Sequence, residues 1–283
     1  IIGEGKSMYR VTKALNHNAI LAVKENSTKE YLLLGRGIGF GKKVTEYVKP
    51  GEDVRIYALK SDSERGNARE LVRDMNPVYL EISNAILKKA EEEFGKIDRS
   101  ILFPMADHIA FAVERIKRGE QISNPLTQDI QVLFYKEYKI AQMAEELIRQ
   151  EEGIEIDKDE IGHIALHVHS SICDENVSNA MQIAAAVREC VAMIEDETGS
   201  KIDVQTLSYN RLMNHIKYMA ARGMTGEELK LDMNEYIEKQ FPNSFQISDS
   251  VCKHLSRALG IELPEIEIGY LAMHIERVCA SQI

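Results

Sequence analysis

The chain has 283 residues, of which 44% are hydrophobic, and its net charge is −10. That length and apolar content suffice to bury the cores of two or three small domains. No apolar run is long enough to cross a bilayer, which argues against membrane insertion. The four cysteines form no C-x-x-C pair, which argues against a disulfide framework and a zinc ribbon. Together these features predict a cytoplasmic protein.

The charge is distributed unevenly along the chain. Residues 1–60 hold eight Lys and three Arg against five Glu and one Asp, a net charge of +5, which leaves −15 for the other 223 residues. Because phosphate contacts dominate nucleic-acid affinity, we expect a polyanion to bind the basic end and to be repelled by the acidic remainder.

The basic end shows the pattern of short strands. Four segments are rich in Val, Ile, Leu and Tyr and are separated by Asn, Gly and Pro, as strands joined by tight turns are. They are residues 9–15, 19–24, 31–34 and 54–59. A small antiparallel β domain is predicted over 8–62; residues 1–7 precede Met8, which fits a natural start, and receive no fold prediction.

A glycine-rich segment, Gly35-Arg36-Gly37-Ile38-Gly39-Phe40-Gly41-Lys42-Lys43, follows the third predicted strand. It is not a nucleotide loop: Arg36 replaces the first glycine of a P-loop, and Phe40 replaces the third glycine of a dinucleotide fingerprint. What remains is a flexible backbone with cations for phosphates and one ring on which an unpaired base could stack. RNA binding is therefore plausible here.

Two asparagines precede this segment in the first predicted turn. Asn16 and Asn18 carry amides that can bond base edges, although Asn in such a position also simply forms a turn.

From residue 71 onward the apolar spacing changes to the three-to-four period of amphipathic helices, and this helical part repeats. Sliding the sequence by 107 positions without gaps aligns 108–167 with 215–274, with 16 of 60 positions identical. Glu160-Ile161-Gly162 matches Glu267-Ile268-Gly269. We predict two homologous helical-bundle domains, 71–176 and 177–283.

Four of the eight histidines fall on the repeat, His108 with His215 and His167 with His274. A single histidine is more often structural than functional, but retention of an imidazole at two places in two divergent copies favours chemistry. His163 pairs with Tyr270 in the self-alignment and is set apart with the other unrepeated histidines.

Three chemical roles are considered for the repeated histidines: metal binding, hydrolysis and reversible phosphorylation. Metal binding lacks a third ligand, and hydrolysis lacks a nucleophile placed equally in both copies, so both are disfavoured. Reversible phosphorylation fits better, because a neutral imidazole is a good nucleophile and the added charge can shift a two-state equilibrium. Asp107, next to His108, could orient its ring.

These residues carry a resemblance to a known family, the transcriptional antiterminators of the BglG/SacY type, over essentially the whole chain from Met8. The Leu-Asn-x-Asn turn and the Gly-Arg-Gly…Phe segment resemble the family's RNA-contacting motifs. The resemblance points to Asn16, Asn18, Gly35, Arg36 and Phe40.

The regulatory part also resembles the family. Asp-His-Ile at 107–109 and Ala-Leu-His at 165–167 resemble the phosphorylation motifs of its first phosphotransferase-system regulation domain, and the motifs around His215 and His274 resemble those of the second. The segments Gly-Ile-Gly-Phe-Gly-Lys-Lys and Asp-His-Ile-Ala-Phe-Ala look closest to glucose-type members, with β-glucoside regulators as the alternative.

The resemblance implies a regulator without enzymatic activity, metal or cofactor. A homodimer would bind a hairpin in a leader mRNA and prevent a terminator from forming. The phosphorylated sugar permease (enzyme II) would phosphorylate the first regulatory domain and inactivate the protein, and HPr would phosphorylate the second. Two alternatives stay open: a DNA-binding activator with the same regulatory domains, which needs a helix-turn-helix, and a histidine-dependent phosphotransferase or metal hydrolase.

Overall fold

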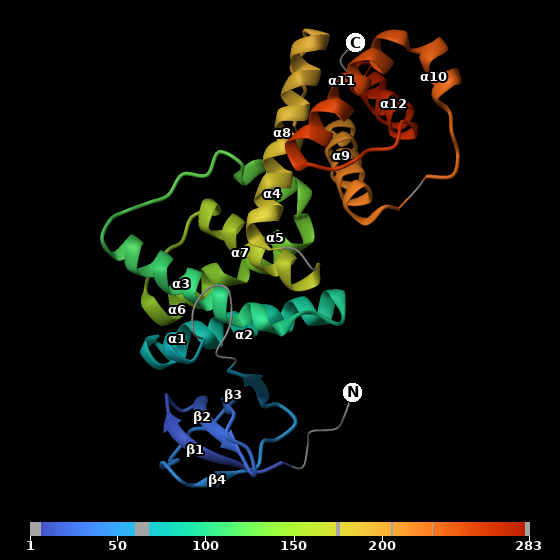
Figure 1. The fold of residues 1–283 in the computed structure, drawn as a ribbon. Coiled ribbons are helices and arrows are strands. Elements are labelled where there is room, and N and C mark those ends of the chain that lie inside the picture. The colour runs from blue at the N-terminus through green and yellow to red at the C-terminus, as the bar shows by residue number, and fades with distance from the viewer. Residues whose placement is uncertain (1–6, 60–67, 174–175, 205, 228, 281–283) are drawn as a thin grey trace. The chain divides into compact units, whose positions relative to one another are not determined.

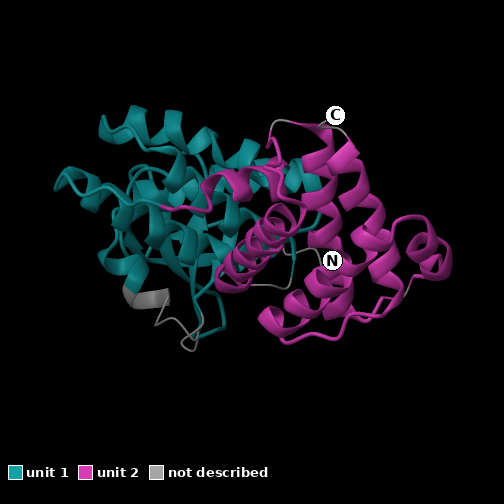
Figure 2. Ribbon diagram, turned by 90° about the horizontal axis from the view of Figure 1, so that it is seen from above, with its two compact units in different colours: residues 1–123, 136–174 teal, residues 124–135, 175–283 magenta. Residues whose placement is uncertain are grey.

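The computed structural model describes residues 7–59, 68–173, 176–204, 206–227 and 229–280 (Figure 1). Residues 1–6 and 60–67, where the sequence predicts no regular element, lie outside the described residues. The chain divides into two compact units, residues 1–123 with 136–174 and residues 124–135 with 175–283 (Figure 2). Among the described residues, no helix combines the length and apolarity needed to cross a membrane.

Unit 1 begins with an antiparallel five-stranded sheet in the order β4-β1-β2-β3-β5. Its strands are β1 (Tyr9–Ala14), β2 (Ala19–Lys24), β3 (Glu30–Leu34), β4 (Tyr47–Val48) and β5 (Arg55–Ala58). Four match the predicted strands closely, and β4 is additional. A buried apolar cluster, which includes Val11, Ile20 and Leu33, forms the core on one side of the sheet.

The rest of unit 1 is helical. Its helices are α1 (Ala68–Asp74), α2 (Pro77–Phe94), the 3₁₀ turn η1 (Arg99–Ile101), α3 (Leu102–Lys117), α5 (Tyr135–Ala141), α6 (Met143–Glu152) and α7 (Lys158–Ile172). Two starts are fixed locally: the side chain of Asn76 caps α2, with Pro77 in its first turn, and the carboxylate of Asp157 accepts the backbone N–H groups of Asp159 and Glu160 at 3.0 Å each. α2 packs against α3, α6 and α7.

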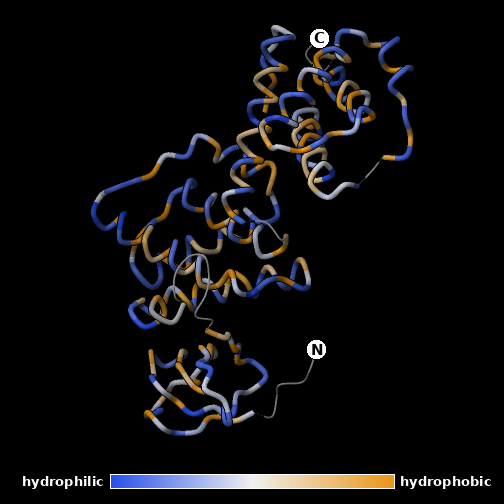
Figure 3. Tube along the Cα trace, in the orientation of Figure 1, coloured by the Kyte–Doolittle hydropathy of each residue, from blue (hydrophilic) through white to orange (hydrophobic). Residues whose placement is uncertain are grey.

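Unit 2 is a helical bundle. It contains α4 (Thr127–Leu133), α8 (Val177–Thr198), α9 (Leu207–Thr225), α10 (Asn234–Gln240), α11 (Pro242–Leu259) and α12 (Ile266–Ala280). Along these helices, as in unit 1, apolar and polar residues alternate every few positions (Figure 3), which is typical of helices with one buried face. The predicted architecture, a β domain followed by helical domains, is confirmed.

Identical glycines of the repeat have a structural cause. Gly119 and Gly226 follow α3 and α9 with φ of +77° and +71°, and Gly153 and Gly260 follow α6 and α11 with φ of +68° and +65°. A left-handed residue ends a helix, and glycine adopts that conformation without steric cost. Chain geometry alone therefore accounts for these identities.

The compact units do not follow the repeat at one place. α4 and α10 are equivalent in the self-alignment, yet α10 packs on α11 and α12, whereas α4 packs on α8 and α9. Asp129 of α4 accepts a hydrogen bond from the hydroxyl of Tyr209 at 3.3 Å, and Nζ of Lys217 donates to the carbonyl of Leu133. The predicted domain boundaries, 8–62, 71–176 and 177–283, stay predictions.

Candidate functional site

The glycine-rich segment forms a tight loop against the turn between β1 and β2. The N–H of Gly39 donates to the carbonyl of His17 at 2.9 Å, and a Cβ at position 39 would lie only 2.1 Å from the carbonyl oxygen of Asn16. Gly37 has a φ of +72°. Close approach at Gly39 and the backbone conformation of Gly37 therefore require these two glycines, which shape the loop.

The two asparagines and the loop form one structure. The carbonyl of Asn18 accepts the N–H of Gly35, and its Oδ1 accepts the N–H of Gly37, both at 2.9 Å. Its Nδ2 donates to Oε2 of Glu81 on α2 at 2.8 Å. Asn16 accepts the N–H of Asn18 through Oδ1 at 2.8 Å, and its Nδ2 donates to Oε1 of Glu81 at 2.6 Å. Both amide groups are thus bound by one carboxylate.

The remaining predicted RNA-contacting side chains face solvent. Arg36 is exposed, and Phe40 is 69% exposed, a large value for an aromatic ring. His17 contacts Phe40 edge to face, with the ring centroids 5.2 Å apart. The structure therefore brings all five predicted residues to one end of the sheet, with a cation and a ring available to a ligand.

The histidines of the first copy converge from two helices. His108 lies on α3, and His163 and His167 lie one turn apart on α7. The ring centroid of His108 is 5.4 Å from that of His163 and 5.4 Å from that of His167. His163, which has no histidine counterpart in the repeat, is thus part of the same cluster. It lies four residues before His167, and residues four apart lie on the same face of a helix.

A buried carboxylate lies behind this cluster. Oε2 of Glu160 is 3.3 Å from Nε2 of His108, and Oε1 of Glu160 is ion-paired with Arg115. Burial raises the pKa of Glu160, but the contacts with His108 and Arg115 outweigh it and hold the pKa below its usual value. The carboxylate that contacts His108 is therefore that of Glu160, and Asp107 is exposed.

The second copy has a tighter pair. The rings of His215 on α9 and His274 on α12 stack with centroids 4.4 Å apart and an angle of 25° between them. Burial, together with the neighbouring His274 and Arg222, lowers the pKa of His215 to about 3. Burial also lowers the pKa of His274. Both imidazoles are therefore neutral at physiological pH, the form that acts as a nucleophile.

The two copies differ in how the carboxylate is used. Glu267, the equivalent of Glu160, binds Arg222 through two hydrogen bonds, Nε to Oε1 at 2.6 Å and Nη2 to Oε2 at 2.8 Å. Nε2 of His108 and Nε2 of His215 are both buried and neither makes a hydrogen bond within the described residues, but only Nε2 of His108 has a carboxylate oxygen close by, at 3.3 Å. The Arg–Glu pair is thus duplicated, but only the first copy places its carboxylate at a histidine.

Besides His163, three functional candidates were not predicted from the sequence: Glu160, Arg115 and Glu81. Glu160 and Arg115 are both identical in the self-alignment to their counterparts, so the repeat did carry a signal for them. The sequence carried no such signal for Glu81, because its contacts with Asn16 and Asn18 span more than sixty residues of sequence.

The unrepeated histidines outside the cluster have structural partners. His169 lies 3.0 Å from Glu137 in the core, and His254 lies 2.9 Å from Glu189. Within the described part of the chain, no group of three or more His, Cys, Asp or Glu side chains has the arrangement needed to hold a metal ion.

Comparison with known proteins identifies the parts of the chain. The model of the CAT RNA binding domain matches residues 9–66, and the model of the PRD domain matches residues 81–171 and 188–278. "Protein GlcT" of Staphylococcus saprophyticus is 29% identical over 271 residues, covering 94% of this chain and 96% of the relative. "Transcription antiterminator LicT" of Bacillus subtilis is 26% identical over 273 residues, covering 95% and 98%.

Two further proteins are similar to this chain. A "Beta-glucoside operon antiterminator" of Dickeya chrysanthemi is 26% identical over 275 residues, covering 95% of this chain and 96% of the relative. Among solved structures, "Crystal structure of GlcT CAT-PRDI" is 30% identical and covers 58% of this chain and 98% of that chain, with a TM-score of 0.49.

Proposed function

We propose, because this chain belongs to the family of transcription antiterminators that join a CAT RNA binding domain to two PRD domains, that it is a sugar-responsive antiterminator. It binds a hairpin of a leader mRNA in the cytoplasm and prevents a terminator from forming. The single observation that carries this proposal is the presence of these three domains in one chain.

The geometry of the glycine-rich loop supports RNA as the ligand. Asn16, Asn18 and Gly35 form a rigid base from which Arg36 and Phe40 extend into solvent. A guanidinium suits phosphates, and an exposed ring suits a base that is not stacked in a duplex. The described N-terminal residues, 7–59, form strands and no helix-turn-helix, which disfavours the DNA-binding alternative.

The paired histidines support control by phosphorylation. In the proposed step, an unprotonated ring nitrogen of His108, His167, His215 or His274 attacks the phosphorus of a phosphorylated donor protein. The new N–P bond forms as the donor's bond to phosphorus breaks, and the donor keeps that electron pair. The phosphorylated sugar permease (enzyme II) serves the first copy and inactivates the protein, and HPr serves the second.

The active species is proposed to be a homodimer, and the inducing sugar is proposed to be glucose. The names of the GlcT relatives favour glucose, whereas the Dickeya relative keeps β-glucosides as the alternative.

RNA binding is tested by selection from a pool of hairpin RNAs with randomised internal loops, using the full chain. We expect one hairpin to be enriched and bound in preference to a DNA duplex of the same sequence. Phe40→Ala and Arg36→Ala should each weaken binding on the order of tenfold, with unchanged thermal unfolding. Arg118→Ala, which removes an exposed charge in the helical part, is the control. Equal binding of RNA and DNA, unaffected by Phe40→Ala, would refute the proposal.

Phosphorylation is tested separately. The full chain is incubated with phosphorylated HPr or a phosphorylated permease domain, and phosphohistidine is mapped by mass spectrometry at neutral pH. Label should appear at the four repeated histidines and not at His254. Label at His108 and His167 that comes equally from both donors would contradict the assignment of the permease to the first copy.

A further inference from the structure

Glu81 occupies the two amide groups that the proposed RNA site would offer to its ligand. Its Oε1 accepts from Nδ2 of Asn16 at 2.6 Å and its Oε2 accepts from Nδ2 of Asn18 at 2.8 Å. Each side-chain amide has two N–H donors, and the one that is bound to Glu81 is not available to a base edge or a phosphate. One carboxylate of a helical domain thus substitutes for an anionic or acceptor-rich ligand.

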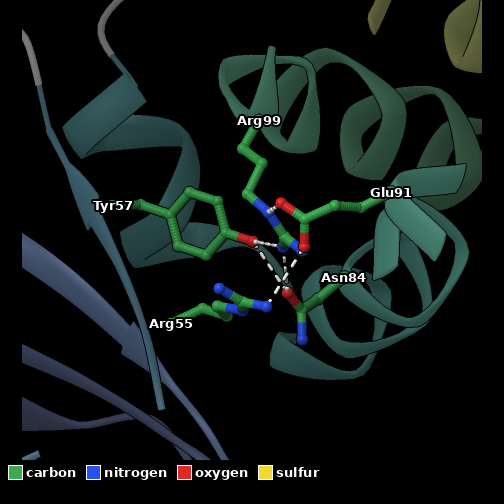
Figure 4. Close-up of polar contacts among 5 residues, drawn as sticks. All are labelled: Arg55, Tyr57, Asn84, Glu91 and Arg99. Carbon is green, nitrogen blue, oxygen red and sulfur yellow. Dashed lines mark hydrogen bonds and ion pairs between the residues drawn. The ribbon is translucent and has the colours of Figure 1, made fainter. Parts of the chain in front are cut away.

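A second set of contacts holds the same helix face against the sheet (Figure 4). The hydroxyl of Tyr57 on β5 donates to Oδ1 of Asn84 at 2.7 Å and accepts from Arg99 at 3.2 Å. Arg55 on β5 and Arg99 both bind Oε2 of Glu91, at 3.1 and 2.5 Å. The head groups of all five side chains meet at one point between β5 and α2.

The helix residues of the two sets of contacts lie on one face of α2. Glu81, Asn84 and Glu91 are spaced by three and ten residues, which places them within about 80° of one another around α2. Hydrogen bonds from Arg99 are the main cause that lowers the pKa of Glu91, so this residue is ionised at neutral pH. Because α2 is held against the sheet at Asn84 and Glu91, the backbone at Glu81 is already in place for the contact with the two asparagines.

The contact leaves part of the RNA site open. Arg36 and Phe40 on the same loop stay exposed. RNA could therefore begin to bind through phosphate and stacking contacts, and it would complete the site only when Glu81 leaves. Such an arrangement lowers affinity by the fraction of molecules in which the amides are free.

We propose that Glu81 is an intramolecular competitor of RNA, which occupies Asn16 and Asn18 in a low-affinity state of the protein and must be displaced for tight binding. This inference rests on the proposed function of the loop and adds its regulation. α2 packs against α3 and α7, which carry His108 and His167, so a rearrangement of that packing acts directly on the helix that presents Glu81.

The first test compares RNA affinity in full-length wild type, Glu81→Ala and Glu92→Ala, with the unselected hairpin RNA pool as the probe. Glu92 lies on the same helix, is exposed and pairs only locally with Lys89 at 3.1 Å, so its variant removes the same charge without touching the loop. We expect Glu81→Ala to bind on the order of tenfold more tightly than wild type and Glu92→Ala to match wild type. The three proteins are compared at concentrations at which light scattering gives them the same molar mass, so that they have the same oligomeric state.

The second test needs no RNA. Hydrogen exchange of the free full chain is followed in peptides that cover 15–19 and 35–41. In Glu81→Ala, exchange should be faster in both peptides, because Asn18 loses its contact with Glu81 and its Oδ1 accepts the N–H of Gly37. In Glu92→Ala, exchange should be unchanged in both peptides.

The outcomes separate the two proposals. If wild type and Glu81→Ala bind RNA equally well, with unchanged exchange, the competitor is refuted and the RNA-binding function stands. If neither protein prefers RNA to DNA and Arg36→Ala changes nothing, the RNA-binding function itself is refuted, and the competitor with it. RNA binding by Glu81→Ala alone supports both.

Discussion

Oε2 of Glu160 lies 3.3 Å from Nε2 of His108, whereas both carboxylate oxygens of Glu267, its equivalent in the second helical copy, accept hydrogen bonds from Arg222. A carboxylate beside an imidazole restricts the orientation of the ring and places a negative charge next to it. The two copies share residue types but differ in the environment of the histidine that each presents.

This difference predicts unequal sensitivity to removal of the carboxylate charge. Glu160→Gln should slow phosphorylation of His108 on the order of tenfold, because the ring loses the negative charge beside it. Glu267→Gln should change phosphorylation of His215 far less, although both variants weaken a buried ion pair and lower thermal stability. The measurement is the rate of phosphohistidine formation at each residue by mass spectrometry. Equal slowing in the two copies would contradict the role assigned to Glu160.

A second prediction concerns stability and pH. Burial lowers the pKa of His215 to about 3, whereas in the unfolded chain it titrates near its ordinary value of 6.5. Below pH 6.5 the unfolded state therefore binds a proton that the folded state does not, and stability falls as pH drops towards 3. His215→Phe keeps the ring and removes this proton uptake. Its free energy of unfolding should fall less between pH 7 and pH 5 than that of wild type, by about 1 to 2 kcal/mol. Urea unfolding at the two pH values measures it, and an identical fall in both proteins would disprove it.

The glycine-rich loop gives a third prediction. In Gly39→Ala the new Cβ would meet the carbonyl oxygen of Asn16 at 2.1 Å and Cγ2 of Ile20 at 3.1 Å, so the backbone must move. We expect a loss of about 2 to 4 kcal/mol in the free energy of unfolding, together with weaker RNA binding. Gly51→Ala, where no atom lies within 4 Å of the added carbon, should stay within about 0.5 kcal/mol of wild type. A fully stable Gly39→Ala protein would show that the loop is not packed as described.

The fourth prediction tests the placement of α4. Nζ of Lys217 bonds the carbonyl of Leu133 and lies 4.6 Å from the ring centroid of Phe134. Lys217→Met should accelerate hydrogen exchange of residues 127–134 several-fold, because it removes both interactions. Lys253→Met, which removes an exposed pair with Asp249, should leave that exchange unchanged. Unaltered exchange in Lys217→Met would place α4 elsewhere.

Local sequence patterns predicted most of the helices and strands. They did not predict very short elements or contacts between residues far apart in the sequence. Strands β1, β2, β3 and β5 follow from their content of Val, Ile, Leu and Tyr and from the turn residues between them, but β4 is only Tyr47–Val48, which is too short to be recognised in this way. It is visible only through its pairing with Tyr9 and Arg10.

The candidate site was predicted in part for a similar reason. Self-alignment singles out residues that both copies keep, so it points to His108 and His167 and passes over His163, which only the first copy has. The contact of Glu81 with two asparagines is made between separate domains, and no local pattern encodes it. Likewise, equivalence in the repeat predicts that α4 packs like α10, and tertiary packing overrides it.

The assignment of α4 has a consequence for cooperativity. Residues 124–135 belong to unit 2 but are joined at both ends to segments of unit 1, so the chain passes between the units three times. Cleavage after residue 174 would leave α4 without α8 and α9 and expose Ile130, Leu133 and Phe134, which are all at most 2% exposed. Unit 2 therefore needs a segment that comes from well before its main part in the sequence, and α4 is expected to unfold together with α8 and α9.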